Sequence, residues 1–272
     1  MGRKPYPLEL ILRVYFMQNW FALSDPGMED ALRDSAAMRD FVGFSSYHDP
    51  VPDETTILNF RHLLEKDQLT EHLFKKVNEV LEQQGLRISS GTIVDATIIS
   101  SPSSTKNKDN ARDPEMKHTR KGNQFYFGMK AHIGVDKDSG MIHSAVCTPA
   151  NVNDVTQAHA LLDGKETCVF GDAGYQGVEN REGCADVIWI TAQRPGRLRL
   201  LDPDTNVGKL ARELEHAKAS IRAKVEHSFR VIKQQFKYQK TRYRGIYKNS
   251  CQIYTLLMLA NLWMFRRKLA PI

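Results

Sequence analysis

Hydrophobic positions recur with two different periods along the chain, and the period changes at about residue 85. Before that point, apolar residues return every three to four positions, which predicts amphipathic helices over 8–21, 28–43, 54–66 and 70–85. After it, apolar residues alternate with polar ones or run together in short segments, as is typical of β-strands. We therefore predict a helical N-terminal region over residues 1–85 and an α/β region over residues 86–272.

The second region alternates strand and helix patterns in a defined order. Strands are predicted over 91–100, 125–136, 141–150, 167–174 and 185–193. Helices are predicted over 153–163, 207–236 and 250–268, and the polar segment 100–123 is predicted to be a mobile loop. Three antiparallel strands, a helix, a strand, a connection, a strand and a long helix form the order of the ribonuclease-H-like fold. In that α/β fold a mixed five-stranded sheet is flanked by helices.

Composition predicts a globular protein without a membrane span. The 272 residues are 41% hydrophobic, enough to bury a full core. The longest apolar-rich run, from Ile253 to Phe265, contains Thr255 and Asn261 and is shorter than the roughly 20 residues that a span requires. The N-terminus has no signal-peptide pattern, so we expect a cytoplasmic protein. The four cysteines are scattered and form no CxxC pair, which argues against a zinc site or a disulfide framework.

Positive charge is concentrated in one segment of the chain. The net charge is +6, and residues 222–248 carry nine basic residues against the single acid Glu226. Five aromatic residues are interleaved with them, a composition that suits a surface contacting phosphates and bases. The alternative is a solvated helix face followed by a basic loop. Glu226, the single acid among these basic residues, is the feature that needs an explanation.

Three acids lie where they could meet at one edge of the predicted sheet. Asp95 lies among apolar neighbours in the first strand, where an unpaired charge costs several kcal/mol. Asp172 ends the apolar run of the fourth strand, and Glu226 lies on the long helix. Each also has an ordinary explanation: a polar strand face for Asp95, a cap of the turn at Gly174 for Asp172, and an exposed ion-pair stripe for Glu226.

Together these carboxylates can hold two hard divalent cations, Mg²⁺ or Mn²⁺, for an in-line phosphodiester displacement. We therefore predict Asp95, Asp172 and Glu226 as catalytic residues and metal ligands. The basic residues predicted to contact DNA phosphates are Arg222, Arg230, Lys233, Lys240, Arg242 and Arg244.

Further candidates for DNA contact come from the strands. Lys130 and His132 alternate and so point to one face of the second strand. They could contact DNA, support the metal ligands from behind, or simply lie on the surface of the strand. Tyr175 follows Asp172 closely enough to stack on a base or to pack the loop. The front helices suit either a helix-turn-helix that reads DNA or a dimerisation module. The reading end would carry Thr55, Thr56, Asn59, Arg61 and His62.

Several segments are similar to a DDE transposase of the insertion-sequence-five family, within the ribonuclease-H-like transposases. They are PDETTILNFRHLLE, VDATII, YFGMKAHIGVD, CTPANVND, VFGDAGYQG and RAKVEHSFRVIK, spread along nearly the whole chain. Related transposases carry a tyrosine, arginine, glutamate and lysine signature around the third acid. Arg222, Glu226 and Lys233 fit its spacing, whereas Ala219 occupies the tyrosine position. The connection over 194–206 is also too short for the β-rich insertion of some relatives.

The resemblance implies cut-and-paste movement of a mobile element. It implies double-stranded DNA as the partner, both the terminal inverted repeats and the target, with a homodimer or higher oligomer on the DNA. Two alternatives stay open: a nuclease of the same fold without strand transfer, and a non-catalytic DNA-binding protein derived from a transposase.

Overall fold

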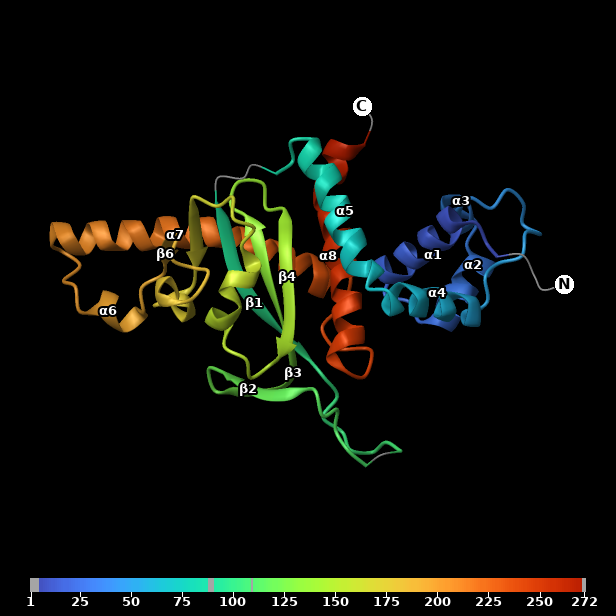
Figure 1. The fold of residues 1–272 in the computed structure, drawn as a ribbon, viewed down its shortest axis with the longest axis horizontal. Coiled ribbons are helices and arrows are strands. Elements are labelled where there is room, and N and C mark those ends of the chain that lie inside the picture. The colour runs from blue at the N-terminus through green and yellow to red at the C-terminus, as the bar shows by residue number, and fades with distance from the viewer. Residues whose placement is uncertain (1–4, 88–90, 109, 271–272) are drawn as a thin grey trace.

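The computed structural model of the protein describes residues 5–87, 91–108 and 110–270, and it has an elongated shape built around one β-sheet (Figure 1). The N-terminal helices lie at one end of the molecule, and the start of a long helix extends past the sheet at the other. The predicted class, a mixed α/β fold with helices flanking the sheet and an all-α N-terminal region, is confirmed. No helix in the described part is long and apolar enough to cross a membrane.

The sheet has six strands, one more than predicted. They are β1 (Thr92–Ser100), β2 (Lys117–Lys121), β3 (Gln124–Asp136), β4 (Ile142–Pro149), β5 (Cys168–Gly171) and β6 (Ile188–Thr191). The order is β2-β3-β1-β5-β6, with β4 also paired to β3, and β1, β5 and β6 run parallel. The additional strand β2 lies inside the segment expected to be a loop. Its five residues are all polar, so only its pairing with β3 shows that it is a strand.

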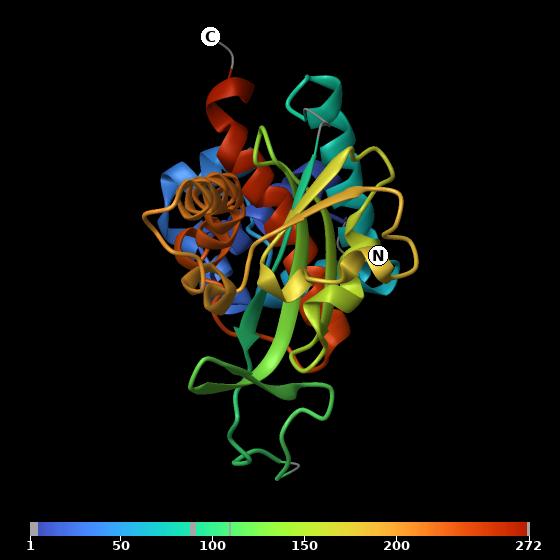
Figure 2. The same ribbon diagram turned by 90° about the vertical axis from the view of Figure 1, so that its left-hand side faces the viewer.

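Different elements cover the two faces of the sheet. Alternate residues of β1 divide between them: Ile93 packs in the main core with helices α7 (Asn206–Arg230) and α8 (Ile246–Leu269), and Val94 packs with η1 (Asp154–Leu161). Figure 2 shows α7 and η1 on opposite sides of the sheet. The helix predicted over 153–163 is present as this 3₁₀ helix over Asp154–Leu161. The remaining short elements are η2 (Ala173–Tyr175), η3 (Val178–Asn180) and α6 (Pro195–Arg199).

The long helix predicted to reach residue 236 changes its geometry before that point. It is α-helical to Arg230 and continues as a π-helical turn over Val231–Gln235. Such turns are rare in proteins, and those that do occur are often found at functional sites. The turn contains Lys233, one of the residues predicted to contact DNA.

The N-terminal helices are α1 (Leu8–Trp20), α2 (Asp25–Asp34), α3 (Ala36–Val42), α4 (Glu54–Lys66) and α5 (Leu69–Gln83). The helix predicted over 28–43 is broken at Ser35, whose hydroxyl caps α3 by accepting a hydrogen bond from the Met38 N–H (3.3 Å). Helices α1 to α4 share a small core of their own, whereas Phe74 of α5 packs in the core of the sheet.

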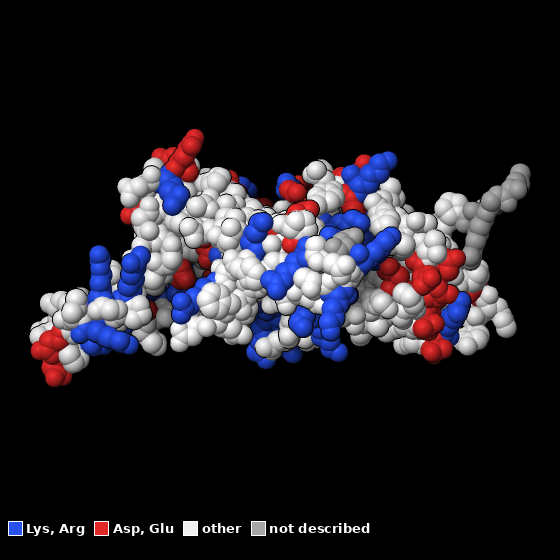
Figure 3. Space-filling view, turned by 90° about the horizontal axis from the view of Figure 1, so that it is seen from below, with Lys and Arg blue, Asp and Glu red and all other residues white. Residues whose placement is uncertain are grey.

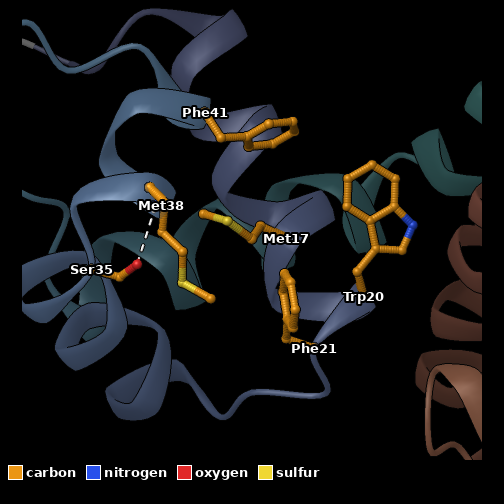
Figure 4. Close-up of a pocket in the computed structure, with 7 residues that line it drawn as sticks. Met17, Trp20, Phe21, Ser35, Met38 and Phe41 are labelled. Atoms are coloured by element: carbon orange, nitrogen blue, oxygen red, sulfur yellow. Dashed lines mark hydrogen bonds between the residues drawn. The ribbon is translucent and has the colours of Figure 1, made fainter. Parts of the chain in front are cut away.

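An apolar pocket of about 390 Å³ opens between α1 and α3, lined by Met17, Trp20, Phe21, Met38 and Phe41 (Figure 4). It belongs to the N-terminal helices and not to the sheet that carries the predicted acids.

Candidate active site

Asp95 and Asp172 lie side by side on adjacent parallel strands. Thr92 pairs with Val169 and Ile93 pairs with Phe170 across β1 and β5. Two residues beyond this last pair, the same register reaches Asp95 on one strand and Asp172 at the end of the other. Neighbouring strands are about 4.8 Å apart, so the register brings the two predicted acids to the same level of the sheet.

Both side chains are directed to the face of the sheet that α7 covers. On β1, Ile93 and Ile99 pack in the core that includes Val225 of α7. Asp95 is two residues after Ile93, so its side chain points to the same face of the sheet. Phe170 of β5 lies in the same core, and Asp172 follows two residues later with an extended backbone. The alternation of the strands therefore directs both carboxylates towards α7.

A tight turn holds Asp172 in place. Its carboxylate accepts a hydrogen bond from the Gly174 N–H (2.8 Å), which caps η2. A Cβ at residue 174 would lie 2.9 Å from that carboxylate oxygen, so a larger residue there would push the carboxylate out of this position. The capping role that the sequence left open for Asp172 is thus present, and it restrains the carboxylate beside Asp95.

The electrostatic environment of Asp95 is unfavourable to its charge. Burial, with a smaller contribution from the nearby charge of Asp172, raises the pKa of Asp95 to about 6, against a lowering by the Ala96 N–H, Arg222 and Lys121. A partly buried carboxylate with a raised pKa beside a second carboxylate is typical of functional sites. The ordinary explanation for Asp95, a solvated polar strand face, does not fit this burial.

Glu226 lies on α7, one turn after Arg222. Lys233 follows in the π-helical turn. The Arg222 guanidinium is close enough to lower the pKa of Asp95, and the Lys233 ammonium donates a hydrogen bond to the Ile98 carbonyl (2.9 Å). Glu226 itself is exposed, and within the described structure it forms no ion pair with Arg222 or Arg230. The ion-pair stripe considered for it from the sequence is absent.

Lys121 adds positive charge that the sequence did not indicate. It lies on β2 and is close enough to lower the pKa values of both Asp95 and Lys233. Burial is the larger cause for Lys233, whose pKa is below its ordinary value. Lys121 was missed because β2 was expected to be part of a loop, and its only sequence signal is the charge of the segment.

The remaining basic candidates lie at the end of α7 and in the segment between its π-helical turn and α8. Lys240 forms a β-bridge with Ser100, and Arg242 donates a hydrogen bond to the Ala22 carbonyl (3.3 Å). Arg230, Lys240, Arg242 and Arg244 are all exposed. Seen from below in Figure 3, Lys and Arg side chains gather in the middle of the molecule, whereas Asp and Glu side chains gather at the end formed by the N-terminal helices.

Three residues predicted to contact DNA are buried or ion-paired within the protein. His132 is fully buried, with Thr148 Oγ1 2.8 Å from its Nε2, and Lys130 is ion-paired with Asp154 (2.8 Å). Both lie on the face of the sheet opposite α7, since His132 pairs with Ala96 on β1 and not with Asp95. Tyr175 is also fully buried, and its ring stacks on Trp189. None of these side chains is available to DNA in this conformation.

Arg61, proposed for the reading end of a helix-turn-helix, is also occupied. It is 9% exposed, pairs with Asp25 and Glu65, and lies over the ring of Tyr243. Thr55, Asn59 and His62 are exposed on α4. Arg61 therefore holds α2 and the segment of Tyr243 against α4, and it is not available to read a base.

A different group of potential ligands converges on the other face of the sheet. In the part of the chain that the structure describes, His143, Asp163 and Glu166 place ligand atoms within 4.8 Å of one another. They already have partners: Thr92 Oγ1 is 2.9 Å from His143 Nε2, Arg87 pairs with Asp163, and two backbone N–H groups donate to Glu166. The oxygens of the three predicted acids are not all within that distance of one another.

Comparison with known families agrees with this arrangement. Residues 87–262 match the family described as Transposase DDE domain, and residues 1–63 match the family described as Transposase domain (DUF772). The first match spans more than half of the chain and includes β1, β5 and α7, the elements that carry the three predicted acids. The chain therefore belongs to the DDE transposase family.

Proposed function

We propose that this transposase catalyses metal-dependent phosphodiester cleavage and strand transfer at the terminal inverted repeats of an insertion sequence, as in the insertion-sequence-five family. The observation that carries the proposal is the pair of carboxylates, Asp95 and Asp172, held at one level of the sheet and directed towards the helix that bears Glu226. We assign these three acids as the catalytic residues.

The donor set suits a hard divalent cation such as Mg²⁺ or Mn²⁺. Asp95 and Asp172 offer carboxylate oxygens side by side, where the charge of Asp172 opposes ionisation of Asp95, and a bound cation would relieve that repulsion. Glu226 is exposed and has no ionic partner among the described residues, and we propose that it joins them when the metal binds. Two ions held there would activate an attacking oxygen and stabilise a leaving one.

The other residues of the site have separate roles in the proposal. The Gly174 turn keeps the Asp172 carboxylate from rotating away, and Arg222 offsets negative charge at Asp95. Lys233 and Lys121 are near enough to hold the phosphates that flank the scissile bond. Arg230, Lys240, Arg242 and Arg244 then bind the rest of the DNA backbone.

We also propose that the helical N-terminal region, residues 1–85 in the predicted division, contributes protein contacts more than phosphate contacts. Residues 1–66 carry ten acidic against seven basic side chains, which disfavours a DNA backbone. Of the two roles that the sequence left open, this charge supports dimerisation.

A reaction with an oligonucleotide copy of one element end tests the proposal. Asp95→Asn, Asp172→Asn and Glu226→Gln are expected to abolish cleavage and strand transfer while retaining DNA binding. Asp163→Asn, in the other group of potential ligands, is the matched control and is expected to remain active. Loss of activity in the control alone would place the metal site there instead. Cleavage without joining to a target would identify a nuclease of the same fold.

A further inference from the structure

The hairpin formed by β2 and the start of β3, residues 117–128, carries an exposed aromatic ring near its tip. It begins where β1 ends, because Gly128 pairs with both Ser100 of β1 and Lys117 of β2. Figure 1 shows β2 lying across this lower end of the sheet. Phe125, close to the turn of the hairpin, is 71% exposed. A single exposed ring is common on protein surfaces, so its surroundings decide what it can bind.

The base of this hairpin is anchored in the protein. Phe127, two residues after Phe125 and on the same face, is half-buried and packs against the main core. The His118 ring lies 4.9 Å from the ring of Phe127, and the Arg112 guanidinium lies over that ring at 5.6 Å. Phe125 therefore projects from a fixed support, on the side of the sheet to which Asp95 is directed.

Arg120 covers one face of the Phe125 ring. The two residues are cross-strand partners, and the guanidinium lies over the ring, 5.5 Å from its centre. The same guanidinium donates hydrogen bonds to the Gly122 carbonyl (2.9 Å) and to the Asn123 side chain (3.2 Å), which fix it against the ring. The other face of the ring is left for a partner. One available face suits a single flat group, whereas insertion between two stacked base pairs uses both faces.

The charge of the hairpin favours a nucleic acid as that partner. Residues 117–128 contain no acid and three exposed basic residues, Lys117, Arg120 and Lys121. Lys121, next to the turn, is close enough to Asp95 and Lys233 to lower their pKa values, so the tip lies near the acids. A ring among basic side chains is the combination that holds single-stranded nucleic acid, because cations contact the phosphates and the ring stacks on a base.

We propose that Phe125 stacks on one unpaired base of the DNA beside the cleavage site, with Arg120 held behind the ring. This inference rests on the proposed function, because the base belongs to the DNA that reaches the carboxylates. Unpairing a base costs free energy, and stacking on the ring offsets part of that cost. The stacked base fixes where the strand lies relative to Asp95 and Asp172, so Phe125 positions the scissile phosphate.

The test is single-turnover cleavage of duplexes that copy one element end. Phe125→Ala is expected to cleave them about tenfold to a hundredfold more slowly, the range that loss of one base–aromatic contact gives. Phe125→Trp keeps a stacking ring and is expected to cleave as the wild type does. Ile188→Ala is the matched control, because this residue of the edge strand β6 is 68% exposed, and it is also expected to cleave normally. The Tm of each variant should be unchanged, since both side chains are exposed.

Duplexes with one abasic nucleotide, placed at each position near the cleavage site in turn, identify the stacked base. At one position the abasic nucleotide is expected to slow the wild type as much as Phe125→Ala does, and the variant should lose nothing further there. Losses that add at every position would overturn the proposal. So would a Phe125→Ala protein that cleaves unmodified DNA at the wild-type rate.

A photo-cross-link provides a measurement that needs no catalysis. The wild type without divalent cations is irradiated with the same duplexes carrying 5-iodouracil or 8-bromoadenine at each position in turn. A covalent adduct is expected at Phe125 from one position beside the cleavage site, and it should be absent in Phe125→Ala. If the wild type cleaves none of the duplexes, the proposed function fails and this adduct alone decides the inference. Adducts only elsewhere on the chain, or at Phe125 from every position alike, would overturn it.

Discussion

Replacing Asp95 with asparagine is expected to stabilise the fold while removing catalysis. Asp95 is a partly buried acid whose carboxylate lies beside that of Asp172, and both burial and this neighbour oppose its ionisation. Asparagine has nearly the same shape and keeps an oxygen to accept the hydrogen bond from the Ala96 N–H (2.7 Å). The substitution therefore removes a charge from an unfavourable position with little change in packing.

The magnitude follows from the pKa of Asp95, which rises from 3.8 to about 6 on folding. Below pH 3.8 the carboxyl is protonated in both states and costs nothing. Between these two values the folded state holds a proton that the unfolded state has lost, so the free energy of unfolding falls by about 1.4 kcal/mol per pH unit. Above pH 6 the penalty is constant at about 3 kcal/mol. The asparagine variant avoids it, which corresponds to about 5 °C in Tm for a chain of this length.

Thermal unfolding of the metal-free protein and of Asp95→Asn, from pH 4 to pH 8, measures this difference. The gain in Tm is expected to be near zero at pH 4 and to reach its full value by pH 7. Added Mg²⁺ or Mn²⁺ should raise the Tm of the wild type but not that of the variant. An Asp95→Asn protein less stable than the wild type at pH 8 would refute the reasoning, because Asp95 would then have a stabilising partner.

Four further outcomes are expected. Glu226→Gln should lose cleavage with an unchanged Tm, since the exposed carboxylate has no ion pair in the described structure; a lower Tm with normal cleavage would contradict its catalytic role. Lys240→Ala should reduce the salt dependence of DNA affinity by about one log–log unit, whereas an unchanged slope would exclude a phosphate contact. Lys233→Ala should lower single-turnover cleavage more than affinity, because its ammonium bonds the Ile98 carbonyl near the acids; equal losses would argue for simple DNA binding. Tyr175→Phe should leave DNA affinity unchanged, as its buried ring packs on Trp189, and weaker binding would show that the ring moves out to the DNA.

The sequence indicated that Asp95 and Asp172 lie side by side, because the pattern of apolar residues in a strand predicts its position in the sheet as well as its type of structure. Asp95 interrupts an apolar strand and Asp172 ends another, and strands of this kind pair in a parallel sheet at a register set by their apolar residues. The proximity of the two carboxylates follows from that register. Glu226 was harder to place, because helical spacing gives the side of α7 on which it lies but not the direction of an exposed side chain.

Burial was what the sequence could not reveal. Lys130 and His132 alternate as surface residues would, yet η1 covers their face of the sheet and brings Asp154 to Lys130. Arg61 was placed at the reading end in the helix-turn-helix alternative, but its partner Asp25, 36 residues away in the sequence, holds it inside the protein. Strand β2 had no apolar residue to mark it. In each case a contact between distant segments decided the outcome, and local pattern does not record such contacts.

The separation of charge along the molecule limits how DNA can approach the acids. The N-terminal helices carry more acid than base, and in Figure 3 their end shows a gathering of Asp and Glu side chains. The middle of the same face is basic and lies beside the end of β1. A phosphate backbone is repelled from the first surface and attracted to the second, over a screening length of about 8 Å at physiological salt. We therefore expect DNA to reach Asp95 and Asp172 over the basic middle of the molecule, and we propose that the N-terminal helices contact protein instead.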